Sequence, residues 1–270
     1  MFSGNGFGFG HEKEFKKCIL NTIMLTVPIL GFRYGRLMAA HISPEEIEKL
    51  KQDFSYLFVV TYGDNPPTGD WQVQKRQAFV IDLTQSINRV FDNFKKNTRN
   101  EIRRAENDPS LSFVSNDHNW KAAYKRYKKF EQARKWMSML KAEFKRSVLF
   151  NAYHRGDIIS GIACYGHNDT LRVNKIFSIR NHNTRSDLSV AVIGYASRKL
   201  IYDICQYGIK NNYTRLDLGG VNFTDNSKIG ISQFKQSFGG DLQYTHVSRY
   251  MTRGFSVLKR FLTLIKKDIN

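Results

Sequence analysis

The residues with the clearest potential for chemistry stand in the stretch 216–242, LDLGGVNFTDNSKIGISQFKQSFGGDL. A strand-like run stops at Asp217, and Gly219 and Gly220 follow it. Glycines at the carboxyl end of a strand let backbone amides approach a ligand, and open mixed sheets place their sites at such ends. Further along, Lys235 stands inside the segment FKQSFGG. Spacing alone leaves open a plainer interpretation, in which the glycines form a turn and Lys235 is a solvated surface side chain.

Several other catalytic chemistries find no support in the residue types. No Gly-x-Ser-x-Gly elbow is present, and none of Cys18, Cys164 and Cys205 has a histidine neighbour in a signature arrangement. The seven histidines are scattered, which argues against a metal site. Three distant cysteines predict a reducing compartment and no disulfide. We therefore expect neither a covalent nucleophile nor a bound metal.

The charge of the chain is its most unusual bulk property, because 270 residues carry a formal net charge of +18. The apolar and charged fractions are those of a folded protein, which excludes a disordered or fibrous class. The positive field favours nucleic acid, nucleotide phosphates or an acidic membrane surface as partners. The apolar run from Cys18 to Phe32 is too short to span a membrane and is interrupted by polar residues, so we expect a buried strand there and a cytoplasmic protein.

Short apolar runs alternate with turns in the first third of the chain. The runs 57–63 and 77–83 predict strands on either side of the breaker cluster GDNPPTGD. A helix capped by Thr84 or Ser86 should follow, with an apolar face that extends to Ala105.

Two groups of cations on predicted helices could bind anions. Arg99 and Arg103 lie one helical turn apart and could bind a substrate phosphate, although most such arginines are simply solvated. The segment 121–146, predicted as a helix, has ten basic residues against two acidic ones, a net +8. Aromatic residues recur along it at helical spacing: Trp120, Tyr124 and Tyr127. This stripe is either a nucleic-acid stacking surface or a face turned to the core.

The pattern becomes strand-rich after residue 146. SVLFNAYH, IISGIACYG and LRVNKIFSI predict three antiparallel strands, separated by turn residues. An amphipathic helix from Leu188 to about Lys210 follows, and then a strand, a short helix around Phe234 and a last strand, DLQYTHVSRYM. This order predicts an α/β protein of α+β character, a mixed sheet with helices on its faces.

Two segments carry a family pattern in the same order. IDLTQSINRVFDNFKKNTRNEIRRAENDPSLSF places an IDL strand before a helix with the spacing R..I.RA, here Arg99, Ile102, Arg104 and Ala105. LDLGGVNF and GISQFKQSFGGDLQYTHVSRYM supply a strand, a glycine turn, a G...FK..FG helix and a final strand. Together they resemble the FemABX family, the peptidoglycan bridge aminoacyltransferases of the GNAT acyltransferase superfamily. The resemblance extends roughly over residues 25 to 267 and implies a GNAT-like acyltransferase fold.

The chain departs from that family in two respects. Characterised FemABX enzymes contain two GNAT-like units, whereas here residues 1–95 would form only a truncated, partial N-terminal GNAT-like region before a complete domain at 96–270. The precursor site shared between the units would then be incomplete. The glycine-rich pyrophosphate loop of coenzyme A users is also missing. A helix N-terminus near Ser186 and Asp187 could receive phosphate through its backbone amides instead.

The resemblance implies an activity and a set of partners. Family members transfer an aminoacyl group from aminoacyl-tRNA, and relatives with the same fold take acyl groups from coenzyme A. The expectation is an N-acyltransferase that moves an aminoacyl or acetyl group onto an amine of a cell-envelope sugar or peptidoglycan precursor, nucleotide-linked or lipid-linked. The basic amphipathic C-terminal run GFSVLKRFLTLIKK would either lie on an anionic membrane or dock against its own domain. The alternative is a non-catalytic RNA- or membrane-binding protein that keeps the fold.

The resemblance also implies roles for single residues. Lys235 matches the lysine of the FK motif and would be a cation beside the donor phosphate or the developing negative charge. Asp217 would orient or deprotonate the amine, or would only cap the glycine turn. The other expected roles are donor binding by Gly219, Gly220, Phe234, Arg180 and Arg185, and binding of an acceptor phosphate by Arg99 and Arg103.

Overall fold

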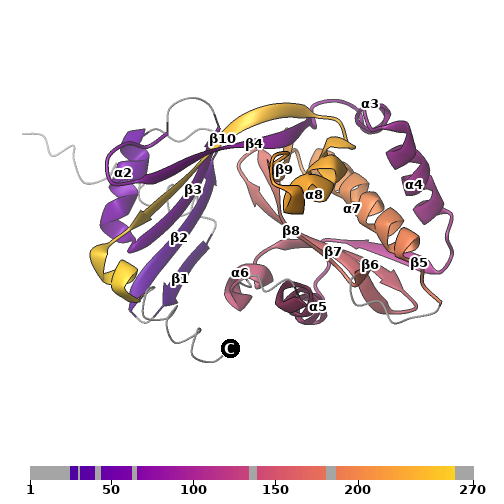
Figure 1. Cartoon of the computed structure of the whole chain (residues 1–270), viewed down its shortest axis with the longest axis horizontal. Helices are drawn as coiled ribbons and strands as arrows, with labels where there is room; N and C mark the ends of the chain where they lie inside the picture. Colours follow the sequence, from indigo (N-terminus) through magenta and orange to yellow (C-terminus); the bar gives the residue numbers. More distant parts are fainter. Residues whose placement is uncertain are drawn as a thin grey trace, which may run out of the picture. The chain divides into compact units, whose positions relative to one another are not determined.

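The computed structural model describes residues 25–29, 31–39, 44–62, 66–133, 139–180 and 187–258. The elements follow one another as shown in Figure 1: β1 (Leu25–Ile29), β2 (Phe32–Ala39), α2 (Pro44–Asp53), β3 (Tyr56–Tyr62), β4 (Gln72–Asp82), α3 (Ile87–Asp92), α4 (Lys96–Glu106), β5 (Leu111–Ser115), α5 (Trp120–Ala133), α6 (Lys141–Lys145), β6 (Val148–His154), β7 (Asp157–His167), β8 (Thr170–Ser178), α7 (Val190–Lys210), β9 (Arg215–Val221), α8 (Asn226–Gln236) and β10 (Asp241–Met251).

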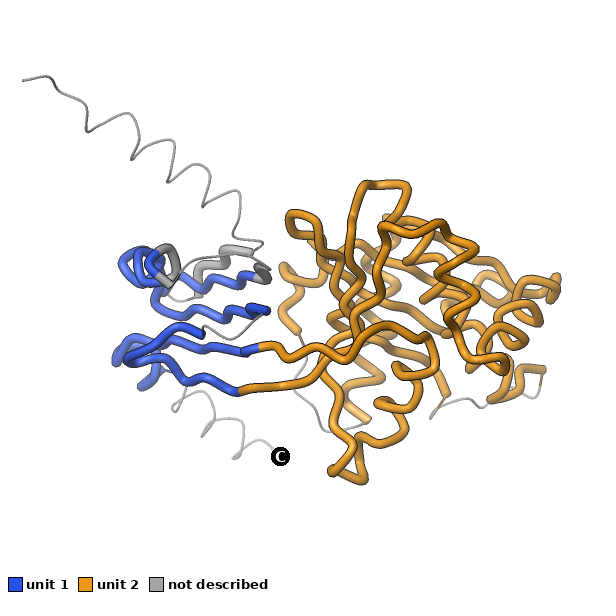
Figure 2. Tube along the Cα trace, turned by 90° about the horizontal axis from the view of Figure 1, so that it is seen from above, with its two compact units in different colours: residues 1–74, 246–270 blue, residues 75–245 orange. Residues whose placement is uncertain are grey.

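The chain divides into two compact units, coloured separately in Figure 2. The first comprises Met1–Gln74 and His246–Asn270, and the second comprises Lys75–Thr245. Strands β4 and β10 therefore each contribute residues to both units. The expected division at residue 95 falls within the second unit and stays a prediction.

The first unit is built on the strand order β1-β2-β3-β10. Strand β1 pairs with β2 antiparallel, and β2 pairs with β3 parallel. Helix α2 contributes Leu50 to a small core around Leu37 and Leu57. Residues 253–258 are helical, and the Phe255 ring lies 5.7 Å from that of Phe32. Phe255 therefore packs within the first unit. The run from Lys259 onward lies outside the described residues, so the choice between membrane contact and docking stays a prediction.

The second unit contains a mixed sheet in the order β10-β4-β9-β8-β7-β6-β5. Strands β6, β7 and β8 form the expected antiparallel meander. Its turns suit their residues, because Gly156 has a φ of 85° and Asn168 a φ of 48°, values that glycine and asparagine tolerate best. Strand β9 then pairs with β8 in parallel, after the crossover through α7. The predicted mixed α/β class is confirmed.

Helices cover both faces of this sheet (Figure 1). Helix α7 packs with α3 and α4 over one face, whereas α5 and α6 lie on the other. The helix expected from residue 84 to 105 is in fact two helices, α3 and α4. The prediction of a single helix over 121–146 is also wrong, because α5 ends at Ala133 and α6 begins at Lys141. Strand β5 was not expected, because it is a short and mostly exposed edge strand.

Candidate active site

The central feature of the second unit is the point where β8 and β9 separate. Their parallel pairing ends at Arg172 and Asp217, although β8 continues to Ser178 and β9 to Val221. Just past this point, each of the two strands shifts its register against its other neighbour. Strand β8 shifts against β7, between Cys164 and Ala163 of β7, and β9 shifts against β4, between Val80 and Ala78 of β4. An extra residue in one strand bends that strand away from its partner. The two strands therefore splay apart in the middle of the sheet.

A cavity of about 500 Å³ opens at this separation. It is lined by residues of five elements: Phe130 and Glu131 of α5, the stretch 173–178 of β8 with Arg180 after it, Ile193, Gly194, Ser197 and Arg198 of α7, Leu218 of β9, and Ser227, Lys228, Gly230, Ile231, Phe234 and Lys235 of α8. Open mixed sheets place ligands where neighbouring strands diverge, so this cavity is the candidate site.

The two glycines lie within β9. The strand does not stop at Asp217, as the sequence suggested, but continues through Gly219 and Gly220 to Val221. Gly219 has a φ of 80°, and its amide donates a hydrogen bond to Oδ1 of Asp217 at 2.5 Å. A Cβ added to Gly219 would lie 3.1 Å from the Val173 carbonyl oxygen and 3.3 Å from Nζ of Lys235. Gly219 is thus required both for its backbone conformation and for the close approach of Lys235.

Lys235 lies in the last turn of α8 and is buried, with 9% of its surface exposed. Its Nζ donates a hydrogen bond to the carbonyl oxygen of Gly220 at 2.8 Å. Burial lowers the pKa of Lys235 to about 8; the negative charge of Asp217 raises it in part, and Arg172 lowers it further. The interpretation of Lys235 as a solvated surface lysine is therefore wrong.

Asp217 is fully buried and forms an ion pair with Arg172 of the neighbouring strand. Its carboxylate also accepts the Gly219 amide, so the capping geometry considered from the sequence is present. The sequence reasoning missed Arg172. A charged residue inside the apolar run LRVNKIFSI was the available signal, but only the register of β8 against β9 reveals its partner.

Phe234 lines the cavity and packs edge-on against Phe238, with ring centroids 5.0 Å apart. Phe238 is buried and contacts Phe94 in the same manner at 5.3 Å. The guanidinium of Arg198 lies 5.3 Å from the centre of the Phe234 ring. These contacts hold the C-terminal end of α8, and with it Lys235, against the core.

The expected phosphate-binding helix end begins later than predicted. Helix α7 starts at Val190, and Ser189 is its cap, accepting a hydrogen bond from the Val192 amide at 3.2 Å. Arg180 lines the cavity. Arg185 and Ser186 lie outside the described residues, so their predicted roles stay predictions.

The expected acceptor-phosphate pair has partners elsewhere in the fold. Nη1 of Arg99 donates to the carbonyl oxygens of Asp92 and Phe94, each at 2.6 Å, and so caps the end of α3. Arg103 lies 5.5 Å over the Phe91 ring. Neither arginine lines the cavity between β8 and β9.

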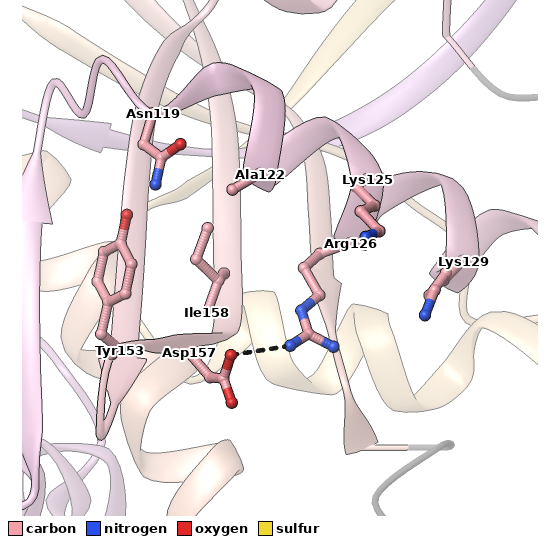
Figure 3. A pocket seen from close by; sticks show the side chains of 9 residues that line it. Asn119, Ala122, Lys125, Arg126, Lys129, Tyr153, Asp157 and Ile158 are labelled. Atoms are coloured by element: carbon pink, nitrogen blue, oxygen red, sulfur yellow. Dashed lines mark hydrogen bonds and ion pairs between the residues drawn. The ribbon is translucent and has the colours of Figure 1, made fainter.

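A second cavity, of about 270 Å³, lies against the basic side of α5 (Figure 3). Lys125, Arg126 and Lys129 line it from the helix, and Tyr153 and Asp157 line it from the β6–β7 hairpin. Nη2 of Arg126 is 3.3 Å from the Asp157 carboxylate. Of the predicted aromatic stripe, Tyr127 is completely buried and faces the core. Trp120 is only partly buried and has the ammonium groups of Lys141 and Lys145 each 5.6 Å from its ring.

The other chemically reactive groups are enclosed. Among the described residues no group of three or more His, Cys, Asp or Glu side chains could hold a metal ion. Cys164 and Cys205 are buried, and burial raises the pKa of both thiols.

Within the same described ranges, no helix is both long and apolar enough to cross a membrane.

Comparison with known proteins gives a clear result for the fold. No family model and no curated protein matches the sequence. FemX is similar in structure, with a TM-score of 0.55 and 10% identity over 82% of each chain. A C-terminal domain assigned to lysylphosphatidylglycerol synthetase of Agrobacterium fabrum has a TM-score of 0.53 and 9% identity, over 89% of this chain and 84% of that one. L-PGS from Bacillus licheniformis has a TM-score of 0.50 and 11% identity, over 85% and 82%.

The chain therefore has a FemABX-type, GNAT-like acyltransferase fold. The fold expected from the sequence resemblance is confirmed.

Proposed function

We propose that the protein is an N-acyltransferase that moves an aminoacyl or acetyl group from an activated donor directly onto an amine. The observation that carries this proposal is the buried Lys235 ammonium beside the cavity where β8 and β9 separate. The fold shared with FemX and the two synthetase structures supports it.

In the proposed reaction the neutral acceptor amine attacks the carbonyl carbon of the donor. A C–N bond forms, negative charge develops on the carbonyl oxygen, and the Lys235 ammonium stabilises that charge. Collapse of the intermediate then breaks the bond to the leaving oxygen or sulfur, which takes up the proton released by the amine. Lys235 suits this role because its hydrogen bond to Gly220 fixes Nζ and leaves two N–H bonds for substrate.

Asp217 contributes by positioning in this proposal. Its carboxylate is enclosed and is already bound by Arg172 and by the Gly219 amide. A general base needs a free oxygen within reach of the proton that it removes. We therefore assign Asp217 two roles. It holds the bulge of β9, which is the irregular stretch at Gly219 where the register against β4 shifts, and it supports the charge on Lys235.

The charge around the cavity supports an anionic donor. Its described lining includes five cations: Lys175, Arg180, Arg198, Lys228 and Lys235. Acyl-CoA and aminoacyl-tRNA are both polyanions and would be attracted by this field. Phe234 lines the cavity and would border the acyl group, whereas Gly219 and Gly220 are not among its lining residues and would act by placing Lys235. Binding of an acceptor phosphate by Arg99 and Arg103 would require them to exchange their present partners.

The acceptor in this proposal is an amine of a cell-envelope precursor, nucleotide-linked or lipid-linked. The likeness to FemX and to lysylphosphatidylglycerol synthetase supports this choice. The reaction would take place in the cytoplasm, at the inner face of the membrane where the precursor is lipid-linked.

Two measurements test the proposed function. Mass spectrometry of envelope glycans and peptidoglycan from a deletion strain should show the loss of one acyl mass, which identifies both group and acceptor. Thermal-shift assays with acetyl-CoA and with aminoacyl-tRNA should show stabilisation by one of them. An unchanged envelope together with no response to either donor would refute the acyltransferase.

The cavity beside α5 favours a second function, the binding of RNA phosphates. Lys125 and Lys129 are exposed and stand on the same side of the helix (Figure 3). A tRNA-dependent transferase would use this surface together with its catalytic cavity, whereas a non-catalytic RNA-binding protein would use this surface alone. A Lys125→Ala/Lys129→Ala double variant should weaken RNA binding and reduce the salt dependence by about 1 to 2 in log–log slope. Equal binding by the double variant and the wild type would exclude this surface.

A further inference from the structure

One acidic side chain stands among the cations of the cavity between β8 and β9. Glu131, in the last turn of α5, is buried with 1% of its surface exposed, and it lines the cavity. It is the only carboxylate among the described lining residues. A carboxylate in that position repels the phosphates of a donor, so its presence calls for another explanation.

The described neighbours of Glu131 do not use the full hydrogen-bonding capacity of its carboxylate. Nζ of Lys175, a partly exposed side chain, is 3.5 Å from Oε1, which is a long contact for an ion pair. No described residue donates a hydrogen bond to Oε2, which is buried as well. An ionised carboxylate that is buried with an empty oxygen is unfavourable unless a further donor reaches it. The last torsion of a glutamate is broad, so a small rotation can turn this oxygen toward the cavity.

A primary ammonium group meets these requirements. It carries the opposite charge, it is small enough for the cavity, and its three donors can reach a carboxylate that already has one cationic neighbour. In an acyl transfer the cavity receives such a group from one of two sources: the α-amine of an aminoacyl donor or the amine of the acceptor. An acetyl donor carries no ammonium group.

We propose that Glu131 is the receptor for a primary ammonium group of the substrate in this cavity. The proposal rests on the proposed acyltransferase function and narrows its substrates. If the ammonium belongs to the donor, the protein selects aminoacyl over simple acyl groups. If it belongs to the acceptor, Glu131 positions the nucleophile and accepts its proton.

The test measures binding of matched probes by isothermal titration. The donor probe is 3′-(L-alanylamino)-3′-deoxyadenosine, a stable mimic of an aminoacyl-tRNA end, compared with its Nα-acetyl derivative. The acceptor probe is Nα-acetyl-lysine amide, compared with the form acetylated on Nε as well. Glu131→Gln keeps the shape and removes the charge.

One of the two amine probes should bind the wild type about 10-fold more tightly than its acetylated form, since hydrogen bonds to charged groups contribute this much. Glu131→Gln should abolish that preference and leave the affinity of the acetylated probe unchanged. The probe pair that responds identifies the donor or the acceptor as the source. Glu143→Gln is the matched control, because Glu143 is also buried and accepts a hydrogen bond from Tyr165 but does not line the cavity.

Three results would overturn the proposal. An undiminished preference in Glu131→Gln would remove Glu131 from recognition while leaving the acyltransferase proposal intact. If Glu131→Gln lost affinity equally for an amine probe and for its acetylated form, Glu131 would have only a structural role. Failure of every probe to bind the wild type, together with no thermal response to aminoacyl-tRNA or acetyl-CoA, would remove the proposed function and this inference together.

Discussion

Nζ of Lys235 donates a hydrogen bond to the carbonyl oxygen of Gly220 at 2.8 Å, which ties the end of α8 to the bulge of β9. Gly219, one residue earlier, has no side chain that could block this contact. The bulge and the lysine thus depend on each other. A buried ammonium group beside the cavity between β8 and β9 lowers the stability of the fold, and a catalytic role would account for its retention.

The first prediction concerns catalysis by Lys235. Lys235→Ala should lower kcat/KM for acyl transfer at least 100-fold, because the oxyanion loses its charged donor. The measurement is a single-turnover assay with the donor identified by thermal shift. Lys210→Ala, which removes an exposed lysine at the end of α7, should retain full activity. Comparable activity in all three proteins would exclude Lys235 from the reaction.

The pH dependence should report the ionisation of Lys235. Its pKa lies near 8, so the ammonium form is lost and kcat/KM should fall as the pH rises through about 8. Lys235→Arg stays protonated at every accessible pH. Its activity should be lower but should show no fall on the alkaline side. An alkaline fall shared by both proteins would have to come from another group.

As the pH rises above about 8, the free energy of unfolding should increase while kcat/KM falls. The pKa of Lys235 is lower in the folded than in the unfolded chain, so the folded state binds fewer protons between about pH 8 and 10.5, and stability should rise with pH in this window. Below pH 8 the burial cost is fully present. Lys235→Met should therefore be more stable than the wild type at pH 7, by about 1 to 3 kcal/mol. Urea unfolding at pH 7 and pH 10 tests this, and the difference should shrink at the higher pH.

Gly219→Ala tests the bulge. The substitution should cost about 1 to 2 kcal/mol, because an L-residue is strained at a φ of 80° and its Cβ would crowd the Val173 carbonyl oxygen and Lys235. Gly230→Ala is the control for stability, since a Cβ at Gly230, within α8, would meet nothing within 4 Å. That variant should be as stable as the wild type, or up to about 1 kcal/mol more stable. Thermal unfolding of the two variants gives the comparison, and equal losses would contradict a special role for the bulge.

Asp217→Asn should be strongly destabilising. It removes the negative charge that Asp217 places beside the buried Arg172 guanidinium, and breaking a buried pair in this way typically costs about 3 to 5 kcal/mol. Asp157→Asn breaks the exposed pair with Arg126 and should cost under about 1 kcal/mol. The urea midpoints of the two variants provide the measurement. A small loss in Asp217→Asn would mean that the buried pair adds little to the separation of β8 and β9.

The sequence determined most of the elements of the second unit. The meander β6–β8, the helix α7 and the succession β9, α8, β10 follow from apolar spacing and from turn residues such as Gly156 and Asn168, and both signals are local. The resemblance in the FK segment also implied a functional role for Lys235. The break between α3 and α4 was not predictable, because the apolar face runs on across it while Arg99 folds back onto the carbonyl groups of Asp92 and Phe94.

The tertiary structure alone decided the chemistry of the candidate site. Asp217 and Arg172 are 45 residues apart and meet only through the register of two parallel strands. The depressed pKa of Lys235 and the burial of Glu131 are sums over atoms from several strands and helices, and no spacing in the chain encodes such sums. A sequence can show that a lysine or a glutamate is present, but its charge state and reach depend on what the fold packs around it.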